Sequence, residues 1–208
     1  LLEFQAKRLL AEQNISVPHG VLVRNVSELN KISYPAVLKA QVPVGGRSKA
    51  GAIQHVSSLA EAQTATESIF AKEVKGYPVY AILAEEICSI EKEYYIACLN
   101  DSQLNRPIII ASAAGGIDVE MITAKNPEKL VKRPVDPLVG LQDYEIRVMA
   151  KALAAAEVDK FAKVIQGLWR IFRNQDATLV EINPMAQTMA DLIALDAKIV
   201  LDAKAVFR

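Results

Sequence analysis

Residues 36–42 read Ala36-Val37-Leu38-Lys39-Ala40-Gln41-Val42, and residues 45–51 read Gly45-Gly46-Arg47-Ser48-Lys49-Ala50-Gly51. The first run follows Pro35 and is typical of an extended, apolar strand. A lysine in such a strand needs water or an anion around its ammonium, because burying an unpaired charge is costly. Phosphate is one such anion. The alternative is an edge strand from which Lys39 points to solvent.

The second run is rich in glycine and carries two cations. Glycines let backbone N–H groups approach an anion closely, and Arg47 and Lys49 add positive charge. The run lacks both the GK[ST] of a Walker A loop and the GxGxxG of a dinucleotide-binding loop. Alone it could be an ordinary turn. Together with Lys39 it predicts a phosphate-binding site, since both would serve the same polyphosphate.

Helices and strands follow on both sides of these runs. Residues 157–175 form the clearest predicted helix, because Val158, Phe161, Ile165, Leu168 and Phe172 recur with the 3, 4 spacing of one buried face. Ser58 and Glu61 form a capping box that opens a helix to about residue 72. Further helices are expected at residues 1–13, with a stripe of Leu2, Ala6, Leu9 and Gln13, at 27–32 with Ser27 as N-cap, and at 143–156.

Strands are expected at residues 21–23, 36–42, 52–56, 79–86, 93–100, 108–111, 178–182 and 191–196. A second glycine pair, Gly115-Gly116, follows the apolar run 108–111. Because helices and strands do not alternate strictly, the pattern predicts an α+β fold.

Polar side chains gather at the ends of late strands. Asn183 follows the strand at 178–182, and Asp196 ends the strand at 191–196. If these strands pair, the two side chains lie side by side and offer the oxygen ligands that Mg²⁺ prefers. The alternative is a polar strand end before a turn. Similarly, Glu85, Glu86 and Glu93 could bind ribose hydroxyls or form a solvated acidic surface.

Composition excludes several classes of protein. Lys plus Arg and Asp plus Glu each total 24, so the chain lacks the basic excess typical of nucleic-acid or membrane-surface binding. No apolar run approaches the ~20 residues of a membrane span. Two cysteines, Cys88 and Cys98, fit a reducing compartment and packed thiols. The two histidines, His19 and His55, have no neighbouring metal ligands.

Four segments together resemble the β-subunit family of succinyl-CoA synthetase (succinate–CoA ligase, NDP-forming). They are the opening Leu2-Glu3-Phe4-Gln5-Ala6-Lys7, the Lys39 strand with its glycine loop, Glu181-Ile182-Asn183-Pro184, and Leu192-Ile193-Ala194-Leu195-Asp196-Ala197-Lys198. The resemblance implies an ATP-grasp fold of two α+β lobes with the nucleotide between them. It assigns residues 1–208 to this domain, with a smaller lobe of roughly residues 20–90 and a larger lobe of residues 1–19 plus 91–208, and without the family's CoA-ligase domain.

The resemblance also assigns roles to particular residues. It places Lys39, Gly46, Arg47 and Ser48 at the nucleotide phosphates, Glu85, Cys88 and Glu93 at the base and ribose, Asn183 and Asp196 at Mg²⁺, and Glu181, as a catalytic residue, at the phosphohistidine loop of a partner α subunit. Ser48, Ala52 and Ala197 stand where the family usually has glycine, which leaves a non-catalytic nucleotide-binding module as an alternative.

The implied activity is that of an acid–thiol ligase. With an α subunit that carries the phosphohistidine, the family converts succinate, CoA and ATP (or GTP) reversibly to succinyl-CoA, ADP (or GDP) and phosphate. Related ligases for malate, citrate or acetate use a similar domain and remain alternatives. A biotin-type carboxylase fits less well, because an arginine would be expected where Met185 stands. The expected compartment is the bacterial cytoplasm or the mitochondrial matrix.

Overall fold

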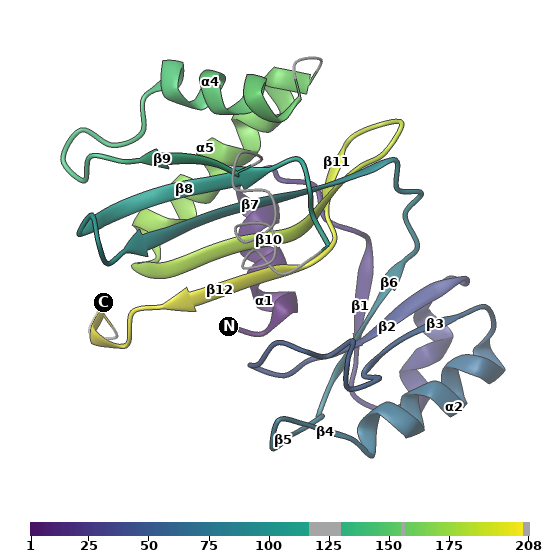
Figure 1. Ribbon diagram of the computed structural model, residues 1–208. Coiled ribbons are helices and arrows are strands. Elements are labelled where there is room, and N and C mark those ends of the chain that lie inside the picture. Colours follow the sequence, from purple (N-terminus) through teal and green to yellow (C-terminus); the bar gives the residue numbers. More distant parts are fainter. Residues whose placement is uncertain (117–129, 155–156, 206–208) are drawn as a thin grey trace. The chain divides into compact units, whose positions relative to one another are not determined.

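The computed structural model describes residues 1–116, 130–154 and 157–205 (Figure 1). Its residues form two compact units. The smaller unit contains Leu2–Phe4 and Pro18–Cys88, and the larger contains Leu1, Gln5–Val17 and Ser89–Arg208. Each has its own sheet and its own apolar core. The predicted α+β class is confirmed.

The smaller unit is built on a four-stranded antiparallel sheet. Its order is β1 (Gly20–Val23), β6 (Ile82–Glu86), β2 (Ala36–Ala40) and β3 (Ile53–Val56). The other elements are the 3₁₀ helix η1 (Val26–Lys31), helix α2 (Leu59–Phe70), and the short pair β4 (Glu73–Val74) and β5 (Tyr77–Pro78). All four strands of this sheet therefore come from the segment Pro18–Cys88.

Alternation along β2 separates an apolar face from a polar one. Leu38 and its neighbours at 36 and 40 pack into the core with Ala62, Ala65 and Ile69 of α2. Lys39 therefore faces the opposite side of the sheet, since successive strand residues point to opposite faces. Because β2 lies between β6 and β3, the edge-strand interpretation of Lys39 is wrong.

The larger unit is built on an antiparallel sheet with helices on one face (Figure 1). The strand order is β11 (Leu192–Ala194), β10 (Ala177–Gln187), β7 (Lys92–Asp101), β8 (Arg106–Ser112) and β9 (Leu130–Pro134), and β12 (Ala197–Leu201) also pairs with β10. The helices are α1 (Glu3–Glu12), which belongs to this unit from Gln5 on, α4 (Asp143–Leu153), α5 (Val158–Asn174) and the short 3₁₀ helix η4 (Ala203–Ala205).

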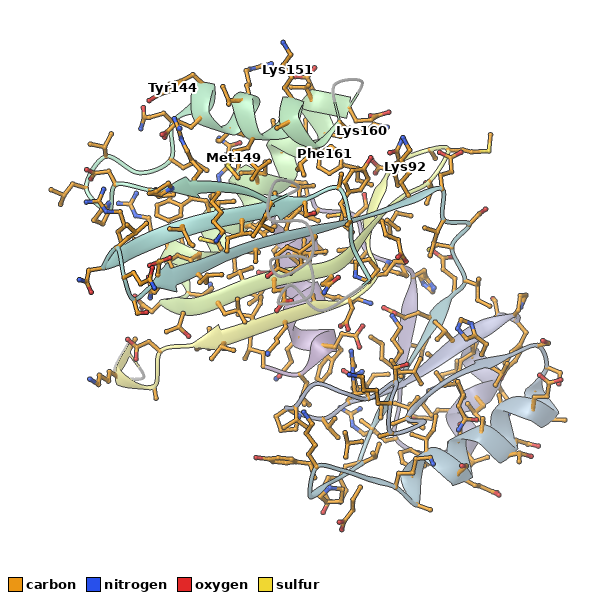
Figure 2. All side chains as sticks on the ribbon, viewed as in Figure 1. Lys92, Tyr144, Met149, Lys151, Lys160 and Phe161 are labelled. Atoms are coloured by element: carbon orange, nitrogen blue, oxygen red, sulfur yellow. The ribbon has the colours of Figure 1, made fainter. Side chains whose placement is uncertain are left out.

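The face predicted for the long helix α5 is confirmed. Phe161, Ile165, Leu168 and Phe172 are buried in the core between the helices and the sheet. Figure 2 shows Phe161 and Met149 on the sheet side of the helices, whereas Tyr144 and Lys151 of α4 project away from it. No helix within the described ranges is long and apolar enough to cross a bilayer.

The predicted capping box at the start of α2 is largely present. The Glu61 N–H donates to the Ser58 hydroxyl, and the Glu61 carboxylate accepts from the N–H of Ser57. Ser27, in contrast, lies inside η1, whose N-cap is Asn25. The difference arises because Ser27 Oγ donates to the Asn25 side chain instead of accepting from the helix.

Three other predictions differ from the structure. The stripe expected on α1 is shifted, since Glu3, Ala6, Lys7 and Leu10 are its buried residues. The strand expected at 79–86 begins only at Ile82. Only residues 192–194 of the strand expected at 191–196 form a strand, β11. A second strand, β12, follows after a break at Leu195 and Asp196. The last two residues of the helix expected at 143–156 lie outside the described residues.

Candidate functional site

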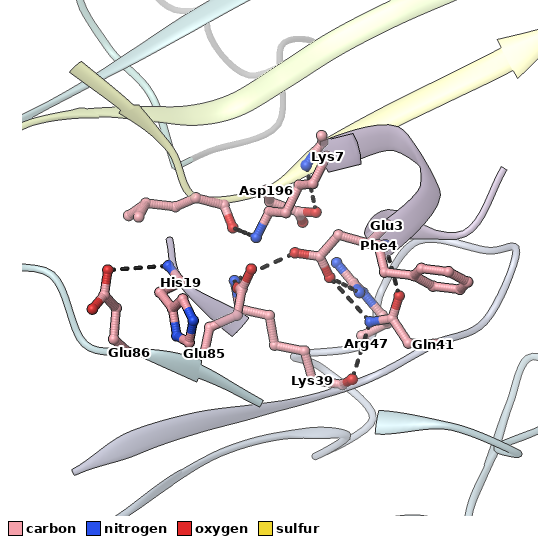
Figure 3. A network of polar contacts seen from close by, with 12 residues as sticks. Glu3, Phe4, Lys7, His19, Lys39, Gln41, Arg47, Glu85, Glu86 and Asp196 are labelled. Carbon is pink, nitrogen blue, oxygen red and sulfur yellow. Dashed lines mark hydrogen bonds and ion pairs between the residues drawn. The ribbon is translucent and has the colours of Figure 1, made fainter. Parts of the chain in front are cut away.

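The polar face of the smaller unit carries a buried charged cluster (Figure 3). We use this name for Glu3, Lys39, Gln41, Arg47 and Glu85, whose exposed fractions are all 8% or less. Lys39 and Gln41 come from β2 and the residue after it, Glu85 from β6, and Arg47 from the glycine loop. Charged side chains this deeply buried require partners of opposite charge, and the cluster supplies them.

Lys39 and Glu85 form an ion pair between adjacent strands on the polar face of the sheet. Lys39 pairs in register with Leu83, and Val37 pairs with Glu85, so the two charged residues are diagonal neighbours on adjacent strands. The Lys39 ammonium lies 2.6 Å from a Glu85 carboxylate oxygen. Glu85 is 2% exposed. Glu85, which the sequence assigns to the base and ribose, is therefore bonded to Lys39, which the sequence assigns to the phosphates.

Glu3 connects the two cations of the cluster. One carboxylate oxygen lies 3.4 Å from the Lys39 ammonium, and the other accepts from the Arg47 guanidinium. Gln41 donates its amide to Glu3 over 3.4 Å and accepts from the N–H of Phe4 over 3.0 Å. Arg47 also donates to the Ala40 carbonyl over 3.2 Å. Glu3 and Phe4, which belong to the smaller unit, are thus bonded to the sheet face that bears Lys39.

The glycine loop turns Arg47 inward and leaves its neighbours exposed. Gly46 has a φ of +92° and Gly51 a φ of +64°, values in the left-handed region that suits glycine. The N–H of Ala52 donates to the Arg47 carbonyl over 2.9 Å, which closes the loop onto itself. Gly46 and Ser48 are exposed, whereas Arg47 is 8% exposed. Of the loop residues expected at the phosphates, Arg47 joins Lys39 in the charged cluster, whereas Gly46 and Ser48 do not.

In the larger unit, Asn183 and Asp196 lie opposite each other on neighbouring chain segments. Ile182 pairs with Ala197, and the next step of the ladder brings the Asn183 N–H within 3.2 Å of the Asp196 carbonyl. Directly opposite residues of an antiparallel pair share one face, so both side chains lie on the same side of the sheet. The Asp196 carboxylate accepts from the N–H of Ala197 over 2.8 Å.

The glycine pair after β8 packs against this polar site. The N–H of Gly116 donates to the Asn183 side-chain oxygen over 2.8 Å, and the N–H of Gly115 donates to the Glu93 carbonyl over 3.0 Å. A Cβ on Gly115 would lie 2.5 Å from the carbonyl oxygen of Tyr94, and one on Gly116 would overlap the Glu93 carboxylate. Both positions therefore require glycine, and the pair Gly115-Gly116 links the Glu93 backbone to the Asn183 side chain.

Glu181 lies on the face of β10 that also carries Asn183. It pairs in register with Lys198 of β12 and with Ala97 of β7. Burial raises the pKa of the neighbouring phenol of Tyr95, and the negative charge of Glu181 raises it further. Cys88, the remaining predicted residue, is half-buried in the segment after β6.

The donor set of the larger unit fits Mg²⁺. Asn183 and Asp196 offer an amide oxygen and a carboxylate, which are hard ligands. Within the described ranges, no group of three or more His, Cys, Asp or Glu side chains could hold a metal ion. A site with one carboxylate and one amide is typical of Mg²⁺ that takes its other ligands from phosphates and water.

Sequence reasoning missed two parts of this arrangement. It did not assign Glu3 or Lys7, although both are buried and Lys7 donates to the Leu195 carbonyl over 2.8 Å, next to Asp196. Their spacing of four residues, together with Ala6 and Leu10, was the available signal for one helix face. It also assigned no role to Gly115-Gly116, because the same two glycines would be expected in an ordinary exposed turn.

Comparisons with known proteins match most or all of the chain. A family model described as an ATP-grasp domain matches residues 1–187. The succinate–CoA ligase [ADP-forming] β subunit of Methanocaldococcus jannaschii is 43% identical over 213 residues, covering 100% of this chain and 58% of that protein. That of Ignicoccus hospitalis is 38% identical over 214 residues, covering 100% and 57%. The chain thus spans little more than half the length of these relatives.

Solved structures show the same fold. An acetyl-coenzyme A synthetase of Ca. Korarchaeum cryptofilum, in complex with coenzyme A and Ca-AMPCP, superposes with a TM-score of 0.79 at 23% identity, covering 97% of this chain and 93% of that chain. An ATP citrate lyase of Methanothrix soehngenii superposes with a TM-score of 0.76 at 23% identity, covering 100% and 52%. At this identity the likeness concerns the fold alone.

Proposed function

We propose, from the premise that this chain belongs to the ATP-grasp domain family, that it is the nucleotide- and Mg²⁺-binding part of a succinate–CoA ligase β subunit. The observation that carries the proposal is the placement of Lys39 and Arg47 in one charged cluster beside the glycine loop. Two cations on one sheet face suit a polyphosphate. The proposal also draws on the identity of 37–43% to relatives that bear the ligase's name.

The proposed phosphate site consists of Lys39, Arg47, Gly46 and Ser48. Arg47 supplies a planar fork of donors that matches phosphate oxygens, and Lys39 supplies a compact charge. Gly46 and Ser48 are exposed on the loop and offer backbone N–H groups. Electrostatic stabilisation of this kind is most of what a protein contributes to phosphoryl transfer.

The proposed metal ligands are Asn183 and Asp196. When bound there, Mg²⁺ would neutralise phosphate charge and polarise the transferred group. The N–H of Gly116 holds the Asn183 oxygen, and the N–H of Ala197 holds the Asp196 carboxylate, so both ligands are oriented by backbone donors. We further propose Glu85, Cys88 and Glu93 for the base and ribose, and Glu181 as the catalytic residue that meets a partner's phosphohistidine loop.

The reaction itself belongs to a larger assembly. We propose that this chain, with an α subunit that carries the phosphohistidine, converts succinate, CoA and ATP or GTP to succinyl-CoA, the diphosphate and phosphate, in the bacterial cytoplasm or the mitochondrial matrix. Its two lobes would be roughly residues 20–90 and residues 1–19 plus 91–208. The part played by this chain would be to hold the nucleotide and present its terminal phosphoryl group.

The test is transfer of the terminal phosphate of labelled ATP to the α subunit. The complex would be prepared with the wild-type chain, with Lys39→Met, and with Lys163→Met on the exposed side of α5 as the control. We expect the control to label the α subunit like the wild type and Lys39→Met to be slower by about a hundredfold, the scale of losing one preorganised donor. Equal labelling by all three would overturn the proposal.

The acid substrate is tested with the same complex. Formation of ADP would be followed with succinate, malate, citrate or acetate in the presence of CoA. We expect succinate to be the preferred acid, and preference for another of the four would replace succinate in the proposal. Absence of transfer to any acid, with nucleotide binding retained, would favour a non-catalytic module.

A further inference from the structure

We propose that Glu3 is an internal counter-anion, which occupies the cations Lys39 and Arg47 and is displaced when phosphate binds them. This inference rests on the proposed function for the identity of the incoming anion. Glu3 would then be a residue that sets nucleotide affinity through its charge, without itself contacting the nucleotide's base or sugar.

The charge of the cluster requires an exchange of this kind. As defined above, the cluster contains two carboxylates, Glu3 and Glu85, and two cations, Lys39 and Arg47, all with side chains no more than 10% exposed. A phosphate group would add negative charge to this buried set, which is costly. Release of one carboxylate removes part of that added negative charge.

Glu85 is the carboxylate that stays. It stands on β6, an inner strand of the sheet, and its bond to Lys39 is 2.6 Å long. Gly20, its register partner on β1, lies so close that a Cβ there would be 2.9 Å from the Glu85 side chain. Glu85 therefore has a strong partner and no room to turn away.

Glu3 is the carboxylate that leaves. It is the first residue of α1, outside the sheet, and it lies 3.4 Å from Lys39, whereas its contact with the Arg47 guanidinium is closer. Its departure leaves each cation with another partner, because Lys39 keeps Glu85 and Arg47 keeps the Ala40 carbonyl. The guanidinium of Arg47, which Glu3 engages, binds carboxylate and phosphate oxygens by the same geometry, so one can replace the other.

The variant Glu3→Gln tests the role of the charge. It keeps the size and the oxygen acceptor but removes one negative charge. Calorimetric titration of the full chain with inorganic tripolyphosphate is expected to show binding about tenfold tighter than in the wild type. The control Glu12→Gln changes an exposed carboxylate of the same helix and is expected to stay within about twofold of the wild type.

Equal or weaker binding by Glu3→Gln overturns the proposal, because it would make Glu3 a fixed support for Lys39 and Arg47. A second measurement needs no variant. If Glu3 leaves the cluster, Gln41 loses a partner, and the N–H of Phe4, which donates to Gln41, should exchange faster with deuterium when tripolyphosphate is added to the wild-type chain. Slower exchange contradicts the displacement.

The proposed function has a separate readout. Lys39→Met is compared with the wild type for binding of Mg–ATP, and unchanged affinity counts against the proposed function. The ratio of the tripolyphosphate affinity of Glu3→Gln to that of Glu12→Gln tests the counter-anion role by itself. If this ratio is above one and Lys39→Met binds Mg–ATP as tightly as the wild type, Glu3 weakens anion binding at a site other than the proposed nucleotide site.

Discussion

Lys39 and Glu85 occupy diagonal positions on strands β2 and β6, and their charged groups lie 2.6 Å apart on the buried polar face of the sheet. A buried pair of this kind constrains both residues, because removal of either partner leaves the other charge uncompensated. Lys39 is therefore held in place before any ligand arrives. The surroundings of this pair and of the polar site in the larger unit lead to several testable predictions.

Gly20→Ala is expected to destabilise the smaller unit. The added methyl would lie 2.9 Å from the Glu85 side chain and 3.2 Å from the Ala84 carbonyl, so the Glu85 side chain or the strand around it must shift. Urea unfolding should give a free energy of unfolding lower by about 1–3 kcal/mol, the usual cost of overpacking. In the control Gly45→Ala, nothing lies within 4 Å of the new methyl. Equal stability of both variants would contradict the close packing.

Gly115→Ala is expected to disturb the polar site of the larger unit. The nearest atoms to a methyl at this position belong to the backbone of Tyr94, which is fixed in β7 and cannot turn aside as a side chain can. The displaced loop would carry the Gly116 N–H away from Asn183, and Mg²⁺-dependent nucleotide binding should weaken by about tenfold. Ala114→Gly serves as the control. Unchanged Mg²⁺-dependent nucleotide binding in Gly115→Ala would show that the glycine pair does not support the site.

Tyr95→Phe is expected to improve stability at alkaline pH. Burial raises the pKa of Tyr95 above its ordinary value of 10.0, and the charge of Glu181 adds to the effect. Well below pH 10.0 the phenol is protonated in both the folded and the unfolded chain, so its titration does not change the free energy of unfolding. Above it, the unfolded chain releases the proton and the folded chain keeps it, so the stability of the wild type falls with rising pH.

The measurement compares urea unfolding at about pH 8 and about pH 11, a span that includes the titration of the unfolded phenol. Tyr95→Phe should lose less stability over this interval than the wild type. Tyr80→Phe changes a tyrosine that is 77% exposed and should lose as much as the wild type. Parallel losses in all three proteins would argue against the assigned environment of Tyr95.

Asp196→Ala is expected to remove the effect of Mg²⁺ on nucleotide binding while the chain stays folded. The carboxylate lies at a break between β11 and β12, where it accepts from the N–H of Ala197. Circular dichroism would confirm the fold, and titration with ATP at several Mg²⁺ concentrations would measure the coupling. A Mg²⁺ dependence equal to that of the wild type would exclude Asp196 as a ligand.

Local signals predicted much of the fold. The spacing of apolar residues identified α5 and its buried face, and Ser58 with Glu61 marked the start of α2. These features depend on neighbours within one or two helical turns, which the sequence displays directly. The pairing near Asn183 and Asp196 was also accessible, because each follows an apolar run and the two runs lie close in sequence, although β10 continues past the expected end at residue 182 to Gln187.

Long-range contacts were not accessible in this way. Glu3 is buried because Lys39 and Arg47, 36 and 44 residues away, receive its carboxylate. Local periodicity assigns charged residues to the exposed side of a helix, so the buried face of α1 was misplaced. Likewise, only the backbone of Tyr94 explains why residue 115 is glycine.

The central claim is that this chain binds a Mg²⁺–nucleotide complex through Lys39, and calorimetric titration tests it most directly. The full chain would be titrated with ATP, ADP, GTP and GDP, with and without Mg²⁺, beside Lys39→Met and the control Lys163→Met. The account predicts Mg²⁺-dependent binding by the wild type and the control, weakened by about a hundredfold in Lys39→Met. Binding of equal strength in all three proteins, or no binding of any nucleotide by the wild type, would contradict it.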